Sequence, residues 1–238
     1  PVVEIVRKHH SLPWRRTHVS FSRTSQVASY TALNSSARAG LFRGNPVLGR
    51  SASQNLEIGL EANLRGWVAE AALFHRRDLS LVDWTFRRGV TARTANAVDV
   101  DVTGIEIVAR RSWAACDVVV GYTALTKVAD YRGAGVDASF YALNYARHRL
   151  TAALTVRLAQ GLELRIDNSA RMQAENILRV AGGDQALITS AGLHFRPAAW
   201  RRLELSARVD NAWDDKFQEV PAVPASPRQV SLVAGLTW

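Results

Sequence analysis

Alternation of apolar and polar side chains with a period of two constrains the fold of this chain more than any other feature. The stretch 229–238 reads QVSLVAGLTW, and its even-numbered residues from Val230 to Trp238 are all apolar. Their odd-numbered neighbours are polar or glycine, with Val233 as the one exception. Because strand side chains point alternately to opposite faces, the stretch predicts a strand with one apolar and one polar face. Such a strand, closing on an aromatic residue, is typical of a membrane β-barrel, whose last strand must pair to complete the wall.

The same alternation recurs along the chain. Residues 55–64 alternate without interruption and precede a tight turn at Arg65–Gly66. Residues 149–158 alternate in the same way and precede a turn at 159–161. Comparable segments predict about ten strands and no helix, with an eleventh strand at residues 2–7. The sequence therefore predicts an all-β protein, an antiparallel transmembrane β-barrel meander of about 10–11 strands.

The connections between these strands are predicted to alternate strictly between short turns and long polar loops. The long loops are expected at residues 24–53, 86–97, 125–147, 173–185 and 211–228. Outer-membrane barrels show this asymmetry, with short turns on the periplasmic side and long loops outside. The alternation changes phase near Thr103–Gly104, which predicts a β-bulge there.

Aromatic residues are sorted between the two kinds of connection. The tryptophans expected at the short-turn ends of strands are Trp14, Trp67, Trp113, Trp200 and Trp238. Trp84, Tyr122 and Tyr145 are expected toward the long-loop ends. A transmembrane barrel carries aromatic girdles at both interfaces, whereas a soluble sandwich has no reason to sort them. The alternative is a chance clustering of hairpin tryptophans.

Composition narrows the class of protein. The chain has 238 residues, 47% of them hydrophobic, and contains no apolar run long enough for a transmembrane helix. The start, PVVEIVRKHH, has no apolar signal-peptide core. Cys116 is the single cysteine and cannot form an internal disulfide. The net charge of +9 suits anionic partners, but the arginines are scattered and match no nucleic-acid-binding module, so no nucleic acid is expected as a partner.

The polar face carries charges of both signs. The residues expected to project into a concave lumen, where a plug would sit, are Glu57, Glu61, Arg149, Arg157, Glu163 and Arg165. Arg157 and Glu163 flank one turn and are expected to form a cross-strand pair. The alternative is that these charges form the solvated outside of a soluble barrel. The apolar face favours lipid, because it is largely Leu, Val and Ala and lacks the varied sizes that a close-packed core needs.

Three segments resemble the β-barrels of TonB-dependent outer-membrane receptors. The run VDNAWDDKFQEVPAVPASPRQVSLVAGLTW resembles the family's C-terminal end, through residues 210–214, 216–218 and the final aromatic strand. Asn45–Leu48 and Asn55–Gly59 resemble a hairpin of the family, and Val102–Glu106 resembles one of its strands. The segments occur in family order. The sequence departs from the pattern at Ala222 and Ser226, where the family prefers glycine, which implies a different loop path.

The resemblance implies both a larger protein and a function. Receptors of this family have a barrel of roughly twenty-two strands, a plug domain and a segment that contacts TonB. Residues 1–238 are therefore expected to be the C-terminal portion of such a barrel, without the plug domain and the N-terminal strands. The parent would take up a scarce solute, an iron chelate, cobalamin or carbohydrate, in the outer membrane of a Gram-negative-type bacterium. The expected partners are outer-membrane lipid, the plug and N-terminal strands, TonB, and the barrel-assembly machinery, which would recognise Trp238.

Two other functions remain as alternatives. A passive porin-like or structural outer-membrane barrel would have the same wall. An outer-membrane hydrolase would need a nucleophile beside a base, and the pair Ser190 and His194 lies two steps apart on one strand face. Histidines 9 and 10 point to opposite faces of a strand, which disfavours a metal site. No catalytic, cofactor-binding or metal-binding residue is predicted.

The residues most exposed to a solute are expected on the long loops. The candidates for substrate-loop contacts are Tyr30, Arg43, Tyr131 and Tyr141. Loop residues positioned by a rigid scaffold frequently carry binding functions, although loop surfaces are polar and aromatic without binding anything. The sequence does not identify the solute.

Overall fold

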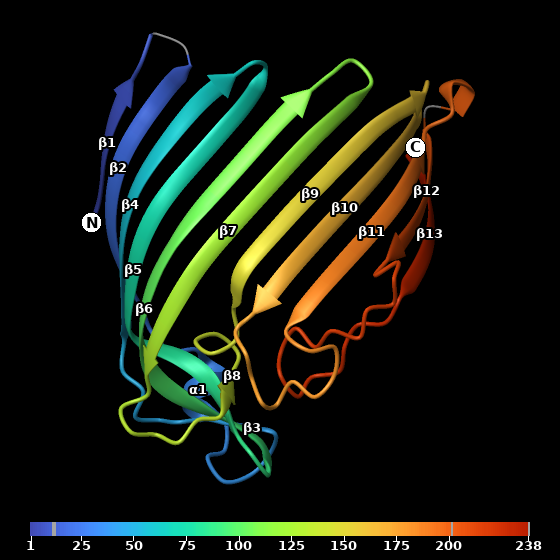
Figure 1. Cartoon of the computed structure of the whole chain (residues 1–238). Coiled ribbons are helices and arrows are strands. Elements are labelled where there is room, and N and C mark those ends of the chain that lie inside the picture. Colours follow the sequence, from blue (N-terminus) through green and yellow to red (C-terminus); the bar gives the residue numbers. More distant parts are fainter. Residues whose placement is uncertain (11–12, 201, 238) are drawn as a thin grey trace.

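The computed structural model describes residues 1–10, 13–200 and 202–237 and consists almost entirely of one antiparallel sheet. Eleven of its thirteen strands follow one another across the wall in chain order, each pairing with the next (Figure 1). These strands are β1 (Val2–Lys8), β2 (Trp14–Gln26), β4 (Ser51–Leu64), β5 (Trp67–Arg87), β6 (Val90–Ser112), β7 (Cys116–Asp130), β9 (Ala146–Ala159), β10 (Leu162–Gln173), β11 (Gln185–Phe195), β12 (Leu203–Asp210) and β13 (Gln229–Leu236). The predicted all-β antiparallel meander is confirmed.

Four short elements lie outside this path. β3 (Phe42–Arg43) pairs in parallel with β6, and β8 (Ala138–Ser139) pairs antiparallel with β5. The helix α1 (Tyr30–Asn34) begins after Ser29, whose hydroxyl accepts a hydrogen bond from the amide of Ala32. A 3₁₀ turn, η1 (Ala198–Trp200), lies between β11 and β12. The helices of the described residues are all too short and too polar to cross a membrane.

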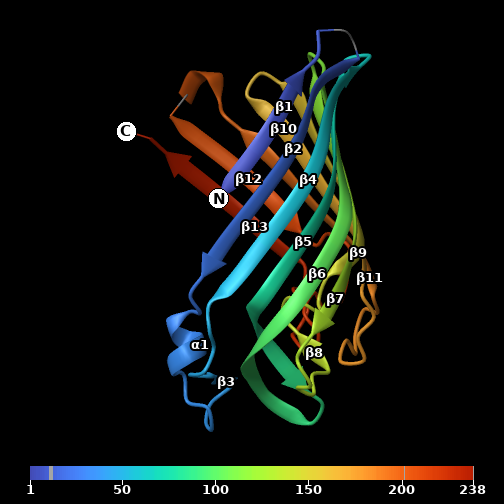
Figure 2. The ribbon, with the colours of Figure 1, turned by 90° about the vertical axis from the view of Figure 1, so that its left-hand side faces the viewer.

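The sheet is an open trough. β1 and β13 form its two edges and do not pair with each other in the described part of the chain. Figure 2 shows both edges on one side of the molecule and β6 and β7 on the other, with α1 on the hollow side. The hollow side is also where the loop residue Ala142 packs on Val100 and Val102.

The outward face carries a band of mainly apolar side chains. Directly opposed residues of antiparallel strands lie on one face of a sheet, so each row of partners identifies a face. One such row contains Ile5, Val19, Ile58, Leu73 and Ile105. The adjacent row contains Leu60, Ala71, Ile107, Tyr122 and Leu150. The apolar sides of 55–64 and 149–158 therefore share one face, as predicted, and this face is opposite to the one covered by the loops.

The apolar band has the height expected for a membrane barrel. On β4 it extends from Leu56 to Leu64, which is roughly 26 Å along the strand at about 3.3 Å per residue. A strand tilt of about 40° reduces this to roughly 20 Å, close to the apolar band of about 25 Å in outer-membrane barrels. Ile58 is 55% exposed and Leu73 is 59% exposed, so no second layer of the described chain covers these side chains on this face.

Two of the predicted loops are wrong in extent. β5 and β6 continue through residues 86–97 and are joined by a turn at Arg88–Gly89, where Gly89 has φ of 76°. Short turns and long loops therefore do not alternate strictly. β7 likewise continues to Asp130, so the loop expected at 125–147 begins later. Beyond the apolar band the strands lose their simple alternation, because the outer face becomes polar and loops cover the inner one.

The predicted bulge at Thr103–Gly104 is also wrong. The pairing of β6 with both neighbours is continuous there. The break lies in β5 between Asp78 and Leu81, where Ser80 has φ of 52° and donates its amide to Asp99 Oδ1 over 2.7 Å. In the sequence pattern, the apolar and polar residues of β6 change sides because the inner face itself becomes apolar at Val98, Val100 and Val102. The loop residue Ala142 packs on this part of the face.

The described tryptophans of the short turns gather at one end, as predicted. Trp14 and Trp67 begin strands, Trp113 follows β6, and Trp200 ends η1. Two of them are in contact, since the rings of Trp67 and Trp113 lie 5.9 Å apart in an edge-to-face arrangement. Trp238, and Ser11 and Leu12 of the first turn, lie outside the described residues.

Candidate functional site

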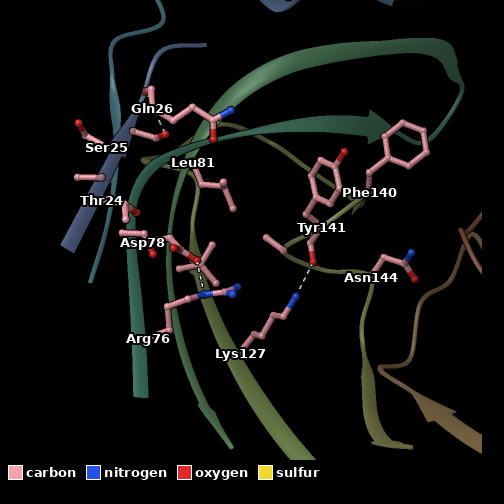
Figure 3. Close-up of a pocket in the computed structure, with 15 residues that line it drawn as sticks. Thr24, Ser25, Gln26, Arg76, Asp78, Leu81, Lys127, Phe140, Tyr141 and Asn144 are labelled. Atoms are coloured by element: carbon pink, nitrogen blue, oxygen red, sulfur yellow. Dashed lines mark hydrogen bonds and ion pairs between the residues drawn. The ribbon is translucent and has the colours of Figure 1, made fainter. Parts of the chain in front are cut away.

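A pocket of about 420 Å³ opens on the inner face at the long-loop end of the wall (Figure 3). Five strands, β2, β4, β5, β6 and β7, and the loop between β8 and β9 contribute to it. Its charged and aromatic lining consists of Arg76, Asp78, Lys127, Phe140 and Tyr141. Small hydroxyl and amide side chains from the ends of β2 and the start of β4 complete the opposite wall. The pocket therefore combines charged, hydroxyl and amide groups with apolar side chains and with an aromatic side supplied by one loop.

Strand geometry places the charged groups of this pocket. Arg76 and Asp78 lie two residues apart on β5 and so share the inner face, where Arg76 Nε donates to Asp78 Oδ2 over 3.0 Å. Lys127 on β7 donates from Nζ to the Tyr141 carbonyl over 2.8 Å, and its ammonium lies 5.1 Å from the centre of the Tyr145 ring. Lys127 thus ties the loop to the wall and faces the pocket at the same time.

Lys127 has an altered proton affinity. Burial lowers the pKa of its ammonium group, and the nearby Arg76 guanidinium lowers it further, while Asp83 and Asp78 act in the opposite direction. The residue lies on the loop side of the Ile105–Ala124 row, where the outer face of β6 carries Thr103 and Asp101, and so outside the apolar band. Two cations and one carboxylate line the pocket, which therefore favours a polar or anionic solute.

The β8–β9 loop is fixed by the fully buried Asp83. The bulge in β5 shifts the phase of the strand, so Asp83 points inward beneath the loop. Its carboxylate accepts hydrogen bonds from the amides of Tyr141 and Ala142 and from the Tyr131 hydroxyl, at 3.1, 2.9 and 2.9 Å. Burial and the negative charge of Asp83 raise the pKa of Tyr131, so its hydroxyl stays protonated and remains a donor.

Substituting Asp83 by Asn should release this loop. The amide has one acceptor oxygen instead of two and brings two N–H groups toward three donors, at a cost of about 1–3 kcal/mol of local stability. Amide hydrogen exchange over residues 137–145 should accelerate, while exchange in the wall strands stays unchanged. Asp101→Asn on the outer face of β6, 48% exposed, is the matched control. Equal exchange in the two variants would contradict the anchoring role of Asp83.

A second anchor, Arg179, ties three loops together. Its side chain, only 1% exposed, pairs with Asp184 and donates to the carbonyls of Ala174 and Gln218 and to Asn144. Its guanidinium also lies 5.4 Å from the centre of the Phe217 ring. The loops β8–β9, β10–β11 and β12–β13 are thereby joined into one unit beside the pocket.

The four predicted substrate-loop residues do not form one cluster. Tyr141 lines the pocket and is 54% exposed. Tyr131 packs against the small core of Val98, Val100 and Val102 and is bonded to Asp83. Tyr30 lies on α1 and is 81% exposed, and Arg43 belongs to β3. Tyr141 is thus the one of the four that lines the pocket.

The six residues predicted to face the lumen lie on the polar face of the wall. Glu57 accepts from His18 Nε2 at 3.0 Å, and Glu61 lies 3.6 Å from Arg15. Arg165 pairs with Asp167 at 2.8 Å, and Arg149 lies opposite Arg171. Glu57, Glu61 and Arg165 therefore have partners on the wall itself, whereas Arg149 lies beside a like charge. That they face a plug remains a prediction.

The expected pairing of Arg157 with Glu163 is correct in register but wrong in contact. The two residues are direct partners across the β9–β10 turn. The Arg157 guanidinium instead pairs with Asp117 on β7 and donates to the carbonyls of Trp113 and Ala114. The β6–β7 turn and the start of β7 together offer three acceptor groups, two carbonyls and the Asp117 carboxylate, whereas Glu163 offers one carboxylate. The Arg157 side chain therefore points toward β7.

Sequence reasoning missed the groups that shape this end of the molecule. Arg76 was visible as a charge on the polar face of a predicted strand, whereas Lys127 fell within the loop predicted at 125–147. Nothing in the sequence placed the two side chains in one pocket. Asp83 and Arg179 gave no signal, because the bulge before Asp83 reverses its face and Arg179 sits in a loop without a pattern.

The hydrolase alternative gains no support from the geometry. Ser190 and His194 lie four residues apart on β11 and pair with Asp167 and Glu163 on β10, so they are separated by roughly 13 Å along the strand. A nucleophile and its base must approach within hydrogen-bonding distance. Among the described residues, no three His, Cys, Asp or Glu side chains are grouped to hold a metal ion.

Comparison with known proteins identifies similar barrels. Residues 9–213 match the family described as TonB dependent receptor-like, beta-barrel. No curated protein matches the sequence. The FrpB iron transporter from Neisseria meningitidis matches in structure with a TM-score of 0.69 at 17% identity, over 98% of this chain and 38% of that one. The ferric enterobactin receptor PfeA from Pseudomonas aeruginosa gives 0.65 at 16% identity, over 98% and 39%.

A copper transporter, OprC, gives a TM-score of 0.67 at 14% identity, over 100% of this chain and 39% of its own. At such identities the likeness concerns the fold alone. The chain spans about two fifths of the length of these transporters and receptors.

Proposed function

The chain belongs to the TonB-dependent receptor-like β-barrel family, and we propose that residues 1–238 form the C-terminal part of a receptor barrel in the outer membrane of a Gram-negative-type bacterium. The observation that carries this proposal is the open trough with an apolar outer face and a charged inner face. Solved proteins of similar fold, an iron transporter and a ferric enterobactin receptor, are more than twice as long as this chain.

The two edges of the trough support a larger barrel. β1 and β13 leave backbone groups without partners, and each such group costs several kcal/mol in hydrocarbon. An open sheet therefore cannot span a bilayer, and further strands would pair with both edges. A plug domain would fill the hollow side against Glu57, Glu61, Arg149, Arg157, Glu163 and Arg165. The barrel-assembly machinery would recognise the final strand through Trp238.

The proposed activity is TonB-dependent, energised uptake of a scarce solute, an iron chelate, cobalamin or a carbohydrate. Iron, ferric enterobactin and copper are named for the similar structures. The pocket of Arg76, Lys127 and Tyr141 favours a polar or anionic solute among these classes. Tyr30, Arg43 and Tyr131 remain candidate loop contacts. The relatives are transporters and receptors, which supports a non-enzymatic role.

Transport by the complete receptor and by the 238-residue chain alone tests this proposal. Both would be expressed in an outer membrane, and assembly would be followed by heat-modifiable migration. Uptake of iron chelates, cobalamin and carbohydrates would be measured with and without TonB. The complete receptor should accumulate one of these solutes only with TonB, and the chain alone should accumulate none.

The alternative of a passive porin has a different signature. It would admit many small solutes at rates independent of TonB, and this result would replace the receptor proposal. TonB-dependent uptake by the 238-residue chain alone would contradict the proposal that it is part of a larger barrel.

A further inference from the structure

An arginine on the outer face packs on one of two contacting tryptophans at the short-turn end of the wall. Arg111 is opposite Val118 on β7, in the row that continues the outer face. Its guanidinium carbon lies 4.7 Å from the centre of the Trp113 ring. The Trp113 ring in turn contacts the Trp67 ring at 5.9 Å. A cation is therefore held against an aromatic pair at the boundary of the apolar band.

The turn between β4 and β5 lies against the Arg111 guanidinium and leaves room for it. Gly66 has φ of 89°, and a Cβ at this position would lie 3.5 Å from Arg111 Cζ. The guanidinium thus contacts the Arg65–Gly66 turn on one side and Trp113 on the other. These contacts fix its position and leave its N–H groups unused, since within the described chain Arg111 makes no side-chain hydrogen bond or ion pair of its own.

The neighbouring Arg110, unlike Arg111, has a carboxylate partner. It points to the inner face and lies 3.5 Å from Glu70, one of the lumen carboxylates. Arg111 points outward, toward the surface on which the apolar band ends. An arginine without a counter-ion at the edge of an apolar surface requires an anion or water for its five donors.

Arg111 lies in the middle of the sheet, away from both of its edges. β5, β6 and β7 are flanked by β4 and β9, and the edges of the sheet are β1 and β13. Strands added at either edge would therefore not cover this part of the outer face. The occupant must come from the medium around the barrel, which at this face is lipid if the proposed membrane location is correct.

We propose that Arg111, Trp67 and Trp113 bind the phosphate of a phospholipid headgroup in the leaflet at the short-turn end. Guanidinium groups bind phosphate oxygens in a bidentate manner, and tryptophan is the residue best suited to the headgroup level of a membrane. The Trp113 ring, 40% exposed, would pack beside the glycerol backbone while Arg111 takes the phosphate. This inference rests on the proposed membrane location of the wall.

The experiment uses the complete receptor, purified in detergent and titrated with phosphatidylglycerol, with bound lipids counted by native mass spectrometry. Arg111→Gln should weaken phosphatidylglycerol binding about fivefold, the value expected for one basic residue at a lipid surface. Arg110→Gln, one residue away on the opposite face, should bind as the wild type does. Arg111→Lys should fall between them, because it keeps the charge and loses the bidentate geometry. Heat-modifiable migration of each variant shows that it is folded.

Equal lipid binding by wild type and Arg111→Gln would overturn the proposal, as would an equal loss in Arg110→Gln. A second titration adds inorganic phosphate at the lipid's concentration, and displacement of the lipid would overturn the assignment to a headgroup. Fractionation of cells is a separate readout. A receptor absent from the outer membrane would refute the proposed function, whereas an outer-membrane receptor without an Arg111-dependent lipid site would refute this inference alone.

Discussion

Replacing Leu154 by Arg should prevent assembly of the barrel in the membrane. Leu154 is the middle one of the five outward-facing residues of β9 from Leu150 to Leu158, and its partners on the same face are Val118 and Ile166. An arginine at the lipid face near the bilayer midplane costs about 2–4 kcal/mol. The measurement is the fraction of heat-modifiable, outer-membrane-inserted protein, which should fall to a small part of the wild-type value.

Ala153→Arg is the matched control, one residue away on the inner face. Ala153 lies opposite Asp167, so a new arginine would have a nearby carboxylate and a hydrated lumen. This variant should assemble as the wild type does. Leu154→Ala, which removes volume without adding charge, should also assemble. A normal yield of Leu154→Arg combined with loss of Ala153→Arg would mean that the two faces have been assigned the wrong way round.

Replacing Arg179 by Met should loosen three loops at once. The substitution leaves Asp184 without its cation and removes the donors to the Ala174 and Gln218 carbonyls. Breaking such a buried pair from one side costs about 3–5 kcal/mol. Protease added to intact cells should cut within residues 174–184 and 211–228 at a much higher rate than in the wild type, while the wall remains inserted.

Arg196→Met provides the control for Arg179. Arg196 also pairs with a carboxylate, Glu204, but its side chain is 68% exposed at the short-turn end. Exposed pairs contribute about 0–1 kcal/mol, so this variant should show the wild-type cleavage pattern. If loop cleavage were unchanged in Arg179→Met, the three loops would be held by contacts other than this guanidinium.

The apolar band of the wall could be predicted from the sequence, because a strand face in contact with lipid needs an apolar residue at every second position. Every second residue of segments such as 55–64 must be apolar, and no partner from elsewhere in the chain alters this requirement. Turns such as Arg65–Gly66 were equally readable, since a left-handed turn restricts the residue types that it accepts.

The part beyond the apolar band was not predictable in the same way. There the inner face is buried under loops, so Val98 and Val100 face inward and the outer face turns polar. The bulge depends on the hydrogen bond that the Asp99 carboxylate accepts from the amide of Ser80, nineteen residues earlier in the chain. The contact of Arg179 with Phe217 joins loops that no local pattern connects. Contacts between distant loop residues therefore determined the candidate site, and the strand pattern determined the scaffold.

The orientation of β4 in a bilayer distinguishes a wall that faces lipid from one that faces water on its apolar side. Single spin labels at residues 55 to 64 of the complete receptor in lipid bilayers would report collisions with oxygen, which dissolves in lipid, and with a water-soluble nickel complex. We expect accessibility to vary with a period of two, with labels at Leu56, Ile58 and Leu60 most accessible to oxygen and labels at Glu57 and Glu61 most accessible to nickel. Equal accessibility of the two sets to the nickel complex, or the reversed order, would contradict a wall that faces lipid with its apolar side.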